Sequence, residues 1–388
     1  MNTKTKSFVA ASVPISSMIM VASVQFGSHA GSGFASGNQA DKYFIQTGYI
    51  GILTPVIAVA LMTLVAREAI AMYNNHKCRN YMDLFRELYH PFDKLAVVFE
   101  IWFNIMVLVS ASSVLAGAAE LLKELNILPY LVTAVLVGII LLFLVIFGES
   151  VVARASTLFT VIILITCFAI FFTGIAEKGI PAIAETIRTS GAPQGHVLPI
   201  LSAFSYAGFC LTVIPSLITT GAVLKNRRNA GGAMLISFFM NLIPLMLSVV
   251  MLFGWSADYR AAGRATLPTL YITEQLGSTV LFLCYNICLL LCMLSTGVTT
   301  TFGFVSRFRD LEFLKKRFQN QRTRCLIVAF VALSASTLFS LVGLDTVVNY
   351  GYRYMGYIGT VIFIIPFLTV GRYKNKKFDA EHRETNGN

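Results

Sequence analysis

Long apolar runs recur along this chain and constrain its fold more than any other feature. A membrane-crossing helix needs about 20 mostly apolar residues, because about 30 Å of hydrocarbon is covered at about 1.5 Å per residue. About ten such runs are present, namely 8–44 (interrupted), 48–72, 92–122, 127–147, 151–175, 198–223, 230–255, 278–304, 325–342 and 353–370. Only 13% of the residues are charged, too few to cover a soluble core of this apolarity. The sequence therefore predicts an all-α integral membrane protein.

Positive charge is concentrated in alternate loops between these runs. The chain has 30 Lys and Arg residues and a formal net charge of +11, a balance that would also suit a nucleic-acid-binding protein. Loops on one side hold 23 of the 30, and loops on the other side hold seven. Because cytoplasmic loops carry the excess of Lys and Arg, we expect a multi-pass protein with both termini in the cytoplasm and no nucleic-acid partner.

Four short segments between the apolar runs have helical amphipathic spacing. Residues 81–89 and 311–318 are predicted to lie along the cytoplasmic surface of the membrane. Residues 180–187 and 271–276 are predicted to be their outer counterparts. Residues 372–388 are polar, and we expect a flexible cytoplasmic tail there.

The first apolar run is interrupted near its centre by residues 27–37, GSHAGSGFASG. Four glycines and three serines weaken a helix at a depth where lipid satisfies no unpaired backbone group. A helix-packing motif of small residues is the alternative, but it does not explain why Ser28, His29, Ser32 and Ser36 are polar. We therefore expect a broken helix whose unpaired backbone lines a cavity.

A second interruption is expected at residues 203–209, AFSYAGF, in the sixth run. If five runs form one repeat and the next five another, the odd number of crossings makes the two halves inverted, with helices 1 and 6 broken at corresponding places. An ordinary kink in the sixth run is the alternative. The predicted division is residues 1–176 for the first five-helix repeat and 177–371 for the second.

Helix breaks of this kind expose backbone groups that can bind ions. The positive end of a half-helix attracts anions, and unpaired carbonyls attract cations. The amides near Ser32, Gly33 and Phe34 are therefore expected to hold a carboxylate or similar group. Carbonyls of either break are expected to receive an ammonium group or a metal ion.

Several motifs resemble one transporter superfamily. GSGF at residues 31–34 resembles the glycine-rich unwound helix of the amino acid–polyamine–organocation (APC) superfamily, and AFSYAGF resembles its broken sixth helix. GSGFASG, LSTGVTTTFGFV (294–305) and YGYRYMGYIG (350–359) resemble segments of the bacterial YkvI-like membrane proteins. The resemblance covers nearly the whole chain. It implies the LeuT fold, a substrate site between helices 1, 3, 6 and 8, and a bacterial inner-membrane location.

The resemblance also implies a sodium ion between helices 1 and 8. By motif, the backbone carbonyls of Gly27 and Ala30 would bind this ion. On the eighth helix its ligands would be the carbonyl of Cys292 and the hydroxyls of Ser295 and Thr296.

The residue types on the eighth helix can also be judged without the resemblance. Ser295 and Thr299 lie one helical turn apart, as do Thr296 and Thr300, so each pair shares a face. Hydroxyl and carbonyl oxygens suit a hard cation such as sodium. Hydroxyls that merely bond back to the preceding turn are the alternative.

Proton coupling is a second alternative. His29 lies within the first break and can titrate near neutrality. Glu100 is a charged residue inside the third run, where it could carry protons, pair with Arg154 or another basic residue as a gate, or lie near the interface. Some proton-coupled relatives place a lysine on the fifth helix, but residues 158–172 carry no charge, which favours sodium. Asn104 is a further polar candidate on the third helix.

Together these inferences predict a sodium-coupled secondary transporter that moves an amino acid or related amine by alternating access. The predicted substrate contacts are Gly31, Ser32, Gly33, Phe34, Ser36, Asn104, Phe204, Ser205, Tyr206 and Gly208; the predicted sodium ligands are Gly27, Ala30, Cys292, Ser295 and Thr296; the coupling or gating candidates are His29, Glu100, Arg154, Thr299 and Thr300. The alternatives are proton coupling and a channel or sensor with the same fold. No phosphate loop, metalloprotease motif or nucleophile constellation points to an enzyme or to another cofactor.

Overall fold

The fold is helical throughout the described chain. The structure, a computed structural model, describes residues 13–193 and 195–386, with the side chains of residues 147–160 and 382–386 outside the description. Within these ranges every regular element is a helix and no strand occurs. The prediction of an all-α protein is confirmed.

Eight helices in the described ranges are long and apolar enough to cross a membrane. They are α4 (Thr54–Asn75), α6 (Ala96–Glu124), α8 (Glu149–Lys178), α10 (Val197–Cys210) continued by α11 (Ile214–Gly221), α12 (Arg227–Ala261), α14 (Thr279–Phe308), α16 (Gln321–Ser340), and a last helix that runs from α17 (Leu344–Thr346) through α18 (Arg353–Gly359) to α19 (Arg372–Asn386). The first predicted run is divided among α1 (Ile15–His29), α2 (Ser32–Ala35) and α3 (Asn38–Tyr43), and the fourth is the shorter α7 (Tyr130–Phe143). These elements account for the predicted apolar runs within the described residues, and residues 8–12 of the first run lie outside them.

Short stretches of tighter or wider helix join the long ones. The 3-10 helices are η1 (Ile45–Ile52), η2 (Asp93–Leu95), η4 (Leu211–Val213) and η5 (Ala222–Leu224), and the π-helical stretches are η3 (Leu144–Gly148), η6 (Val347–Tyr352), η7 (Thr360–Ile364) and η8 (Phe367–Gly371). The predicted repeat boundary at residue 176 falls in the last turn of α8. The division into two repeats at that residue stays a prediction.

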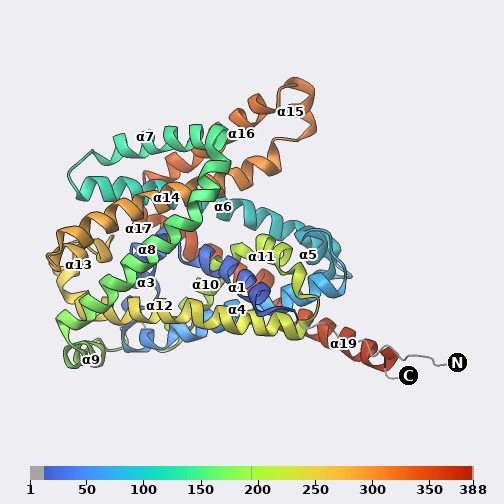
Figure 1. The fold of residues 1–388 in the computed structure, drawn as a ribbon, viewed down its shortest axis with the longest axis horizontal. Coiled ribbons are helices and arrows are strands. Elements are labelled where there is room, and N and C mark those ends of the chain that lie inside the picture. The colour runs from blue at the N-terminus through green and yellow to red at the C-terminus, as the bar shows by residue number, and fades with distance from the viewer. Residues whose placement is uncertain (1–12, 194, 387–388) are drawn as a thin grey trace.

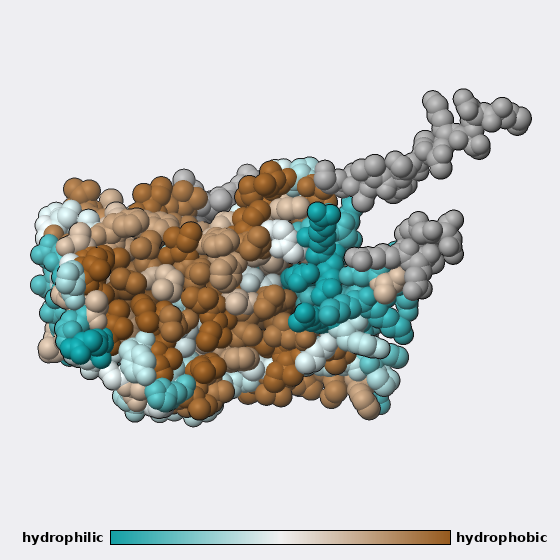
Figure 2. Space-filling model, turned by 90° about the horizontal axis from the view of Figure 1, so that it is seen from below, coloured by the Kyte–Doolittle hydropathy of each residue, from teal (hydrophilic) through white to brown (hydrophobic). Residues whose placement is uncertain are grey.

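The long helices extend between two opposite ends of the molecule (Figure 1). One end carries α5 (Tyr81–Tyr89), α15 (Glu312–Arg317) and α19, and we call it the basic end. The opposite end carries α9 (Ile180–Thr189) and α13 (Pro268–Gln275). Figure 2 shows a broad apolar belt between polar side chains at the two ends. Such a belt is expected of a multi-pass membrane protein, because lipid solvates apolar side chains.

The four amphipathic segments predicted between the runs are all helical. They correspond to α5, α9, α13 and α15. In α5 the apolar Leu84, Phe85 and Leu88 are buried, and Asn80 caps the first turn by accepting the N–H of Asp83. Such capping satisfies a backbone donor that the helix leaves unpaired.

The sixth membrane helix departs from its prediction. It runs as regular α-helix through residues 203–209, where an interruption was expected, and changes to 3-10 geometry at Leu211–Val213. Pro215 explains the position, because proline lacks an N–H and its ring crowds the carbonyl four residues earlier, which belongs to Leu211. The position predicted for the interruption, residues 203–209, is therefore wrong.

Gly208 has a packing role in this helix. α10 packs along α18, and a Cβ added to Gly208 would lie only 2.2 Å from the carbonyl oxygen of Gly356. A Cβ added to Gly356 would lie 2.1 Å from the carbonyl oxygen of Ser205. Small residues allow the two backbones to touch, as in other membrane helix pairs.

The flexible tail predicted for residues 372–388 is wrong for residues 372–386, which form α19, and residues 387–388 lie outside the described part of the chain. Asn375 is fully buried there, and its side-chain amide donates to the backbone carbonyl of Glu68 (3.0 Å) and to its carboxylate (2.9 Å). The Glu68 carboxylate also pairs with Arg227 at 2.7 Å. α19 thus joins the ends of α4 and α12 through a buried ion pair.

Candidate functional site

The first membrane helix is broken where the sequence predicts it. α1 ends at His29, and Ala30 and Gly31 leave the helical region with φ −78°, ψ 36° and φ −80°, ψ −168°. The short α2 follows, and Gly37 has φ 77°, a conformation that glycine adopts without strain. A Cβ at Gly37 would also lie 2.5 Å from Oγ1 of Thr269. The interruption predicted for residues 27–37 is confirmed.

This break lies against α14. A Cβ added to Gly31 would lie 3.8 Å from Oγ1 of Thr296 and 3.8 Å from the carbonyl oxygen of Ser28. Cys292 and Ser295 are buried on the same stretch of α14. The structure therefore brings a hydroxyl of the predicted sodium set to the end of α1, where helix carbonyls lack their usual donors.

Exposure distinguishes two faces of α1. Ala30 is buried, whereas Gly27 and Ser28 are exposed and a Cβ at Gly27 would have nothing within 4 Å. On α14, Thr299 and Gly303 are also exposed. Small and polar residues are thus accessible on both helices in the half of the molecule nearer the basic end.

The two outer threonines of the predicted α14 set bond to their own helix. Thr299 Oγ1 donates to the carbonyl of Ser295 at 2.9 Å, and Thr300 Oγ1 donates to that of Thr296 at 2.8 Å. The bonding-back alternative therefore describes Thr299 and Thr300. Ser295 and Thr296 are the predicted hydroxyls nearest the break, and the Thr296 hydroxyl hydrogen-bonds the side chain of Cys292 in the preceding turn.

His29 connects the break to the sixth helix. Its Nε2 atom lies 2.7 Å from the hydroxyl of Tyr206, a buried hydrogen bond. The rings of Phe34 and His29 are 5.7 Å apart, and Tyr206 packs among Tyr43 and Phe44. Of the residues predicted on the sixth helix, Tyr206 is thus in direct contact with the broken segment.

A polar cluster between α1 and α12 was not predicted. Ser237 Oγ donates to Gln25 Oε1 at 2.8 Å, and Asn241 Nδ2 donates to the carbonyl of Ser237 at 2.7 Å. Among the described residues, no partner is found for the buried Gln25 Nε2 atom, and Asn241 is a side-chain hydrogen-bonding neighbour of His29. Each unpaired buried polar atom costs about 1–3 kcal/mol, so this cluster suits a small polar guest such as water. An asparagine inside an apolar run was the available sequence signal.

The other predicted residues of the sixth helix have structural contacts. Ser205 Oγ donates to the carbonyl of Arg353 at 2.7 Å, and the carbonyl of Phe204 accepts a hydrogen bond from Thr360 at 3.2 Å. Gly208 packs on Gly356. These three residues bind α10 to the last helix.

The predicted substrate residues in and around the short α2 differ in their burial and in their hydrogen bonds. Ala35 N–H donates to the carbonyl of Gly31, so the amides of residues 32–34 precede the first hydrogen bond of this turn. Ser32 is buried, and Ser36 Oγ donates to the carbonyl of Gly33 at 3.1 Å. A Cβ at Gly33 would lie 2.4 Å from the amide end of the Gln39 side chain, so a larger residue there would require that side chain to move.

Glu100 pairs with Arg307 at the basic end. The Arg307 Nε atom lies 2.6 Å from the Glu100 carboxylate, and Tyr81 donates to the same carboxylate at 2.6 Å. Burial, reinforced by Glu100, raises the pKa of Tyr81, so its hydroxyl stays a donor. Asn104 donates back to the Glu100 carbonyl at 2.7 Å. The Arg154 side chain lies outside the described part of the chain.

Ion pairs hold the opposite end together. The fully buried Asp41 pairs with Arg260 at 2.9 Å, and Lys42 pairs with Asp345 at 3.2 Å. Arg353 donates to the carbonyl of Lys42 at 2.6 Å. These contacts tie α3, just beyond the break, to α12 and to the last helix.

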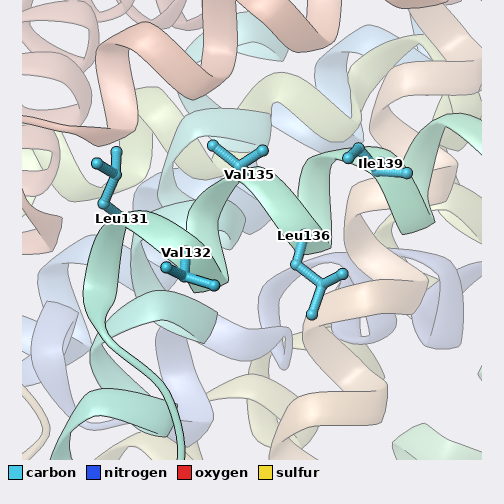
Figure 3. Close-up of a pocket in the computed structure, with 5 residues that line it drawn as sticks. All are labelled: Leu131, Val132, Val135, Leu136 and Ile139. Carbon is cyan, nitrogen blue, oxygen red and sulfur yellow. The ribbon is translucent and has the colours of Figure 1, made fainter.

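A shallow apolar groove on α7 does not resemble a solute site. Figure 3 shows that its lining comes from one helix, with the residues Leu131, Val132, Val135, Leu136 and Ile139. All five are exposed and apolar. A solute site needs polar groups to orient its ligand, whereas an exposed aliphatic face suits lipid.

Solved transporter structures share this fold. A Na⁺-coupled sialic acid symporter in a substrate-bound outward-open state aligns with a TM-score of 0.61 and 14% identity, covering 90% of this chain and 78% of that one. MhsT in complex with L-phenylalanine aligns with a TM-score of 0.56 and 15% identity, covering 94% and 97%. Mhp1, a nucleobase-cation-symport-1 family transporter with bromovinylhydantoin bound, aligns with a TM-score of 0.52 and 15% identity, covering 86% and 74%.

These similarities establish the fold of the chain as that of the LeuT-fold transporters. No protein-family model matches the sequence, and no curated protein matches it.

Proposed function

We propose that this chain is a sodium-coupled secondary transporter, not an enzyme, and that it moves an amino acid or related amine by alternating access. We place it with the YkvI-like proteins of the APC superfamily, in a bacterial inner membrane. The basic end would face the cytoplasm, because cytoplasmic loops carry the excess of Lys and Arg. Both chain termini would then be cytoplasmic.

One observation carries the proposal: the break in the first helix lies beside Thr296 of α14. Sodium would bind the carbonyls of Gly27 and Ala30 together with oxygens of Ser295 and Thr296, and Cys292 would contribute its carbonyl. These are hard oxygen ligands, which suit a small hard cation. The negative end of the α1 dipole would add to the attraction.

Sodium at this place could couple to solute movement because its ligands come from two helices. A bound ion would favour the state in which α1 approaches α14, and a ligand shifts an equilibrium by its differential affinity for the two states. The exposure of Gly27, Ser28 and Thr299 and the ion pairs around α3 support access from the basic end and closure at the opposite end in this state.

The solute would bind beside the break. The amides of residues 32–34 and the Tyr206 hydroxyl are the polar groups nearest to it, and Phe34 would supply an apolar wall. Amides that precede a helical hydrogen bond attract a carboxylate, which supports an amino acid. The L-phenylalanine bound to the structural neighbour MhsT supports the same class.

Reconstituted vesicles test this function. A thermal-shift screen of purified protein against amino acids, amines and nucleobases would first select a solute, and uptake of that labelled solute would then be measured under an imposed sodium gradient. We expect accumulation above equilibrium with sodium outside, none with potassium, and collapse when an ionophore dissipates the sodium gradient.

Other outcomes of this assay would contradict the proposal and favour one of its alternatives. Uptake that survives sodium removal but collapses with a protonophore would indicate proton coupling, with His29 as the buried candidate at the break. Glu100 fits that role less well, because it is paired with Arg307. Solute that equilibrates but never accumulates would indicate a channel or a sensor.

A further inference from the structure

Residues 307–324, which we call the basic loop, concentrate positive charge at one place on the basic end. This segment has seven basic and two acidic side chains, a net charge of +5. Lys316, Arg317 and Arg322 are exposed, and within the described residues no carboxylate lies in ion-pair range of them. By contrast, Arg227, the first residue of α12, is already paired with Glu68. The basic loop therefore offers unneutralised charge.

A buried arginine gives the basic loop a fixed shape. Arg324 is only 9% exposed, and its guanidinium donates to the carbonyls of Arg309 (3.0 Å), Phe318 (2.9 Å) and Gln319 (3.0 Å). Leu314 of α15 is also buried. Because the backbone is held on several sides, the exposed cations are presented in one arrangement, and preorganisation lowers the entropic cost of binding.

An exposed aromatic side chain accompanies these cations. Phe313 is 65% exposed, although it lies between two membrane helices, since α14 ends at Phe308 and α16 begins at Gln321. A segment this short between two spans must lie at the membrane surface. At that depth Phe enters the acyl boundary while Lys and Arg stay at the headgroups.

We propose that the basic loop binds the headgroup of an anionic phospholipid, with Phe313 inserted beside it. Arginine recognises phosphate oxygens through two parallel hydrogen bonds, and lysine adds a point charge. An anionic lipid surface complements the net charge of +5. The proposal does not depend on which solute or ion the chain carries.

Lipid titration tests the proposal on the full-length protein. Phosphatidylglycerol or phosphatidylcholine is titrated into detergent-solubilised protein, and the melting temperature gives the half-saturating lipid fraction. We expect phosphatidylglycerol to stabilise the protein at low lipid fraction and phosphatidylcholine to do so weakly. In the triple variant Lys316→Gln/Arg317→Gln/Arg322→Gln the half-saturating fraction should rise by at least about tenfold, because each cation near an anionic surface contributes about 1 kcal/mol.

Two further variants separate the loop from general charge and from folding. Lys94→Gln/Lys225→Gln/Arg228→Gln removes three exposed cations outside the basic loop and should keep the response to phosphatidylglycerol. Phe313→Gln keeps the charge of the loop and should weaken the response to the intact lipid.

Several results would overturn the proposal. One is a loop variant that responds to phosphatidylglycerol like the parent protein. Equal stabilisation by inorganic phosphate would indicate a free-anion site. If neither phosphatidylglycerol nor phosphatidylcholine stabilised the parent protein, the exposed loop would be assigned to a protein partner instead. Each variant has its own lipid-free melting temperature as reference, so a change in folding does not mimic a change in lipid binding.

Discussion

Replacing Arg227 by methionine is expected to lower the free energy of unfolding by about 3–5 kcal/mol, because it leaves the Glu68 carboxylate buried without its partner. Glu68 is 3% exposed and lies 2.7 Å from Arg227. Asn375 would still donate to the carboxylate at 2.9 Å, and the partly exposed Arg67, 3.9 Å away, would be the remaining cation. The apparent melting temperature of the purified protein, followed by tryptophan fluorescence, measures this loss.

The neighbouring Arg228 provides a matched control. It is exposed, so Arg228→Met should change the melting temperature little. Adding Glu68→Gln to Arg227→Met should restore most of the loss, because a neutral amide can still accept from Asn375. If Arg227→Met and Arg228→Met had the same melting temperature, the buried network between α4, α12 and α19 would not stabilise the fold.

The second large effect is expected at the contact between α10 and α18. Gly208→Ala places a methyl group 2.2 Å from the carbonyl oxygen of Gly356, and neither backbone can rotate away as a flexible side chain would. The helices must separate, at a cost above the usual range of about 1–3 kcal/mol for overpacking. We expect little monodisperse protein on size-exclusion chromatography.

Gly356→Ala should reproduce this effect, since its Cβ would lie 2.1 Å from the carbonyl oxygen of Ser205. Gly303→Ala is the control, because nothing lies within 4 Å of its Cβ, and alanine favours a helix over glycine. A Gly208→Ala protein as stable as Gly303→Ala would show that the two helices do not approach as closely as described.

The first broken helix could be predicted from sequence because its cause is local. Glycine and serine between residues 27 and 37 oppose a helix inside a run that otherwise fits one. The sixth helix was harder, since Gly208 and Pro215 are both possible causes of a break. Proline removes a hydrogen bond wherever it sits in a helix, whereas the effect of Gly208 depends on what packs against it.

The remaining features depend on residues far apart in the sequence. Arg227 and Glu68 are 159 positions apart, and Ser237 and Gln25 are 212 apart. Neither residue of such a pair carries a pattern that points to its partner, so Glu68 and Asn241 were not singled out. The candidate sodium site could be predicted from sequence because the family resemblance gave candidate ligands on both the first and the eighth helix. Its assignment stays a prediction.

Sodium binding by the purified protein tests the central claim, that the broken first helix and α14 form one ion site. Equilibrium binding of radioactive sodium would be compared for the parent protein, Ser295→Ala/Thr296→Ala, and the control Thr219→Ala, which removes an exposed hydroxyl that bonds back to Pro215. We expect saturable binding by the parent and the control and at least about a tenfold weaker affinity in the double variant, because each lost ligand to a charged group contributes about 1.5–3 kcal/mol. Unchanged sodium affinity in a folded double variant would contradict the account.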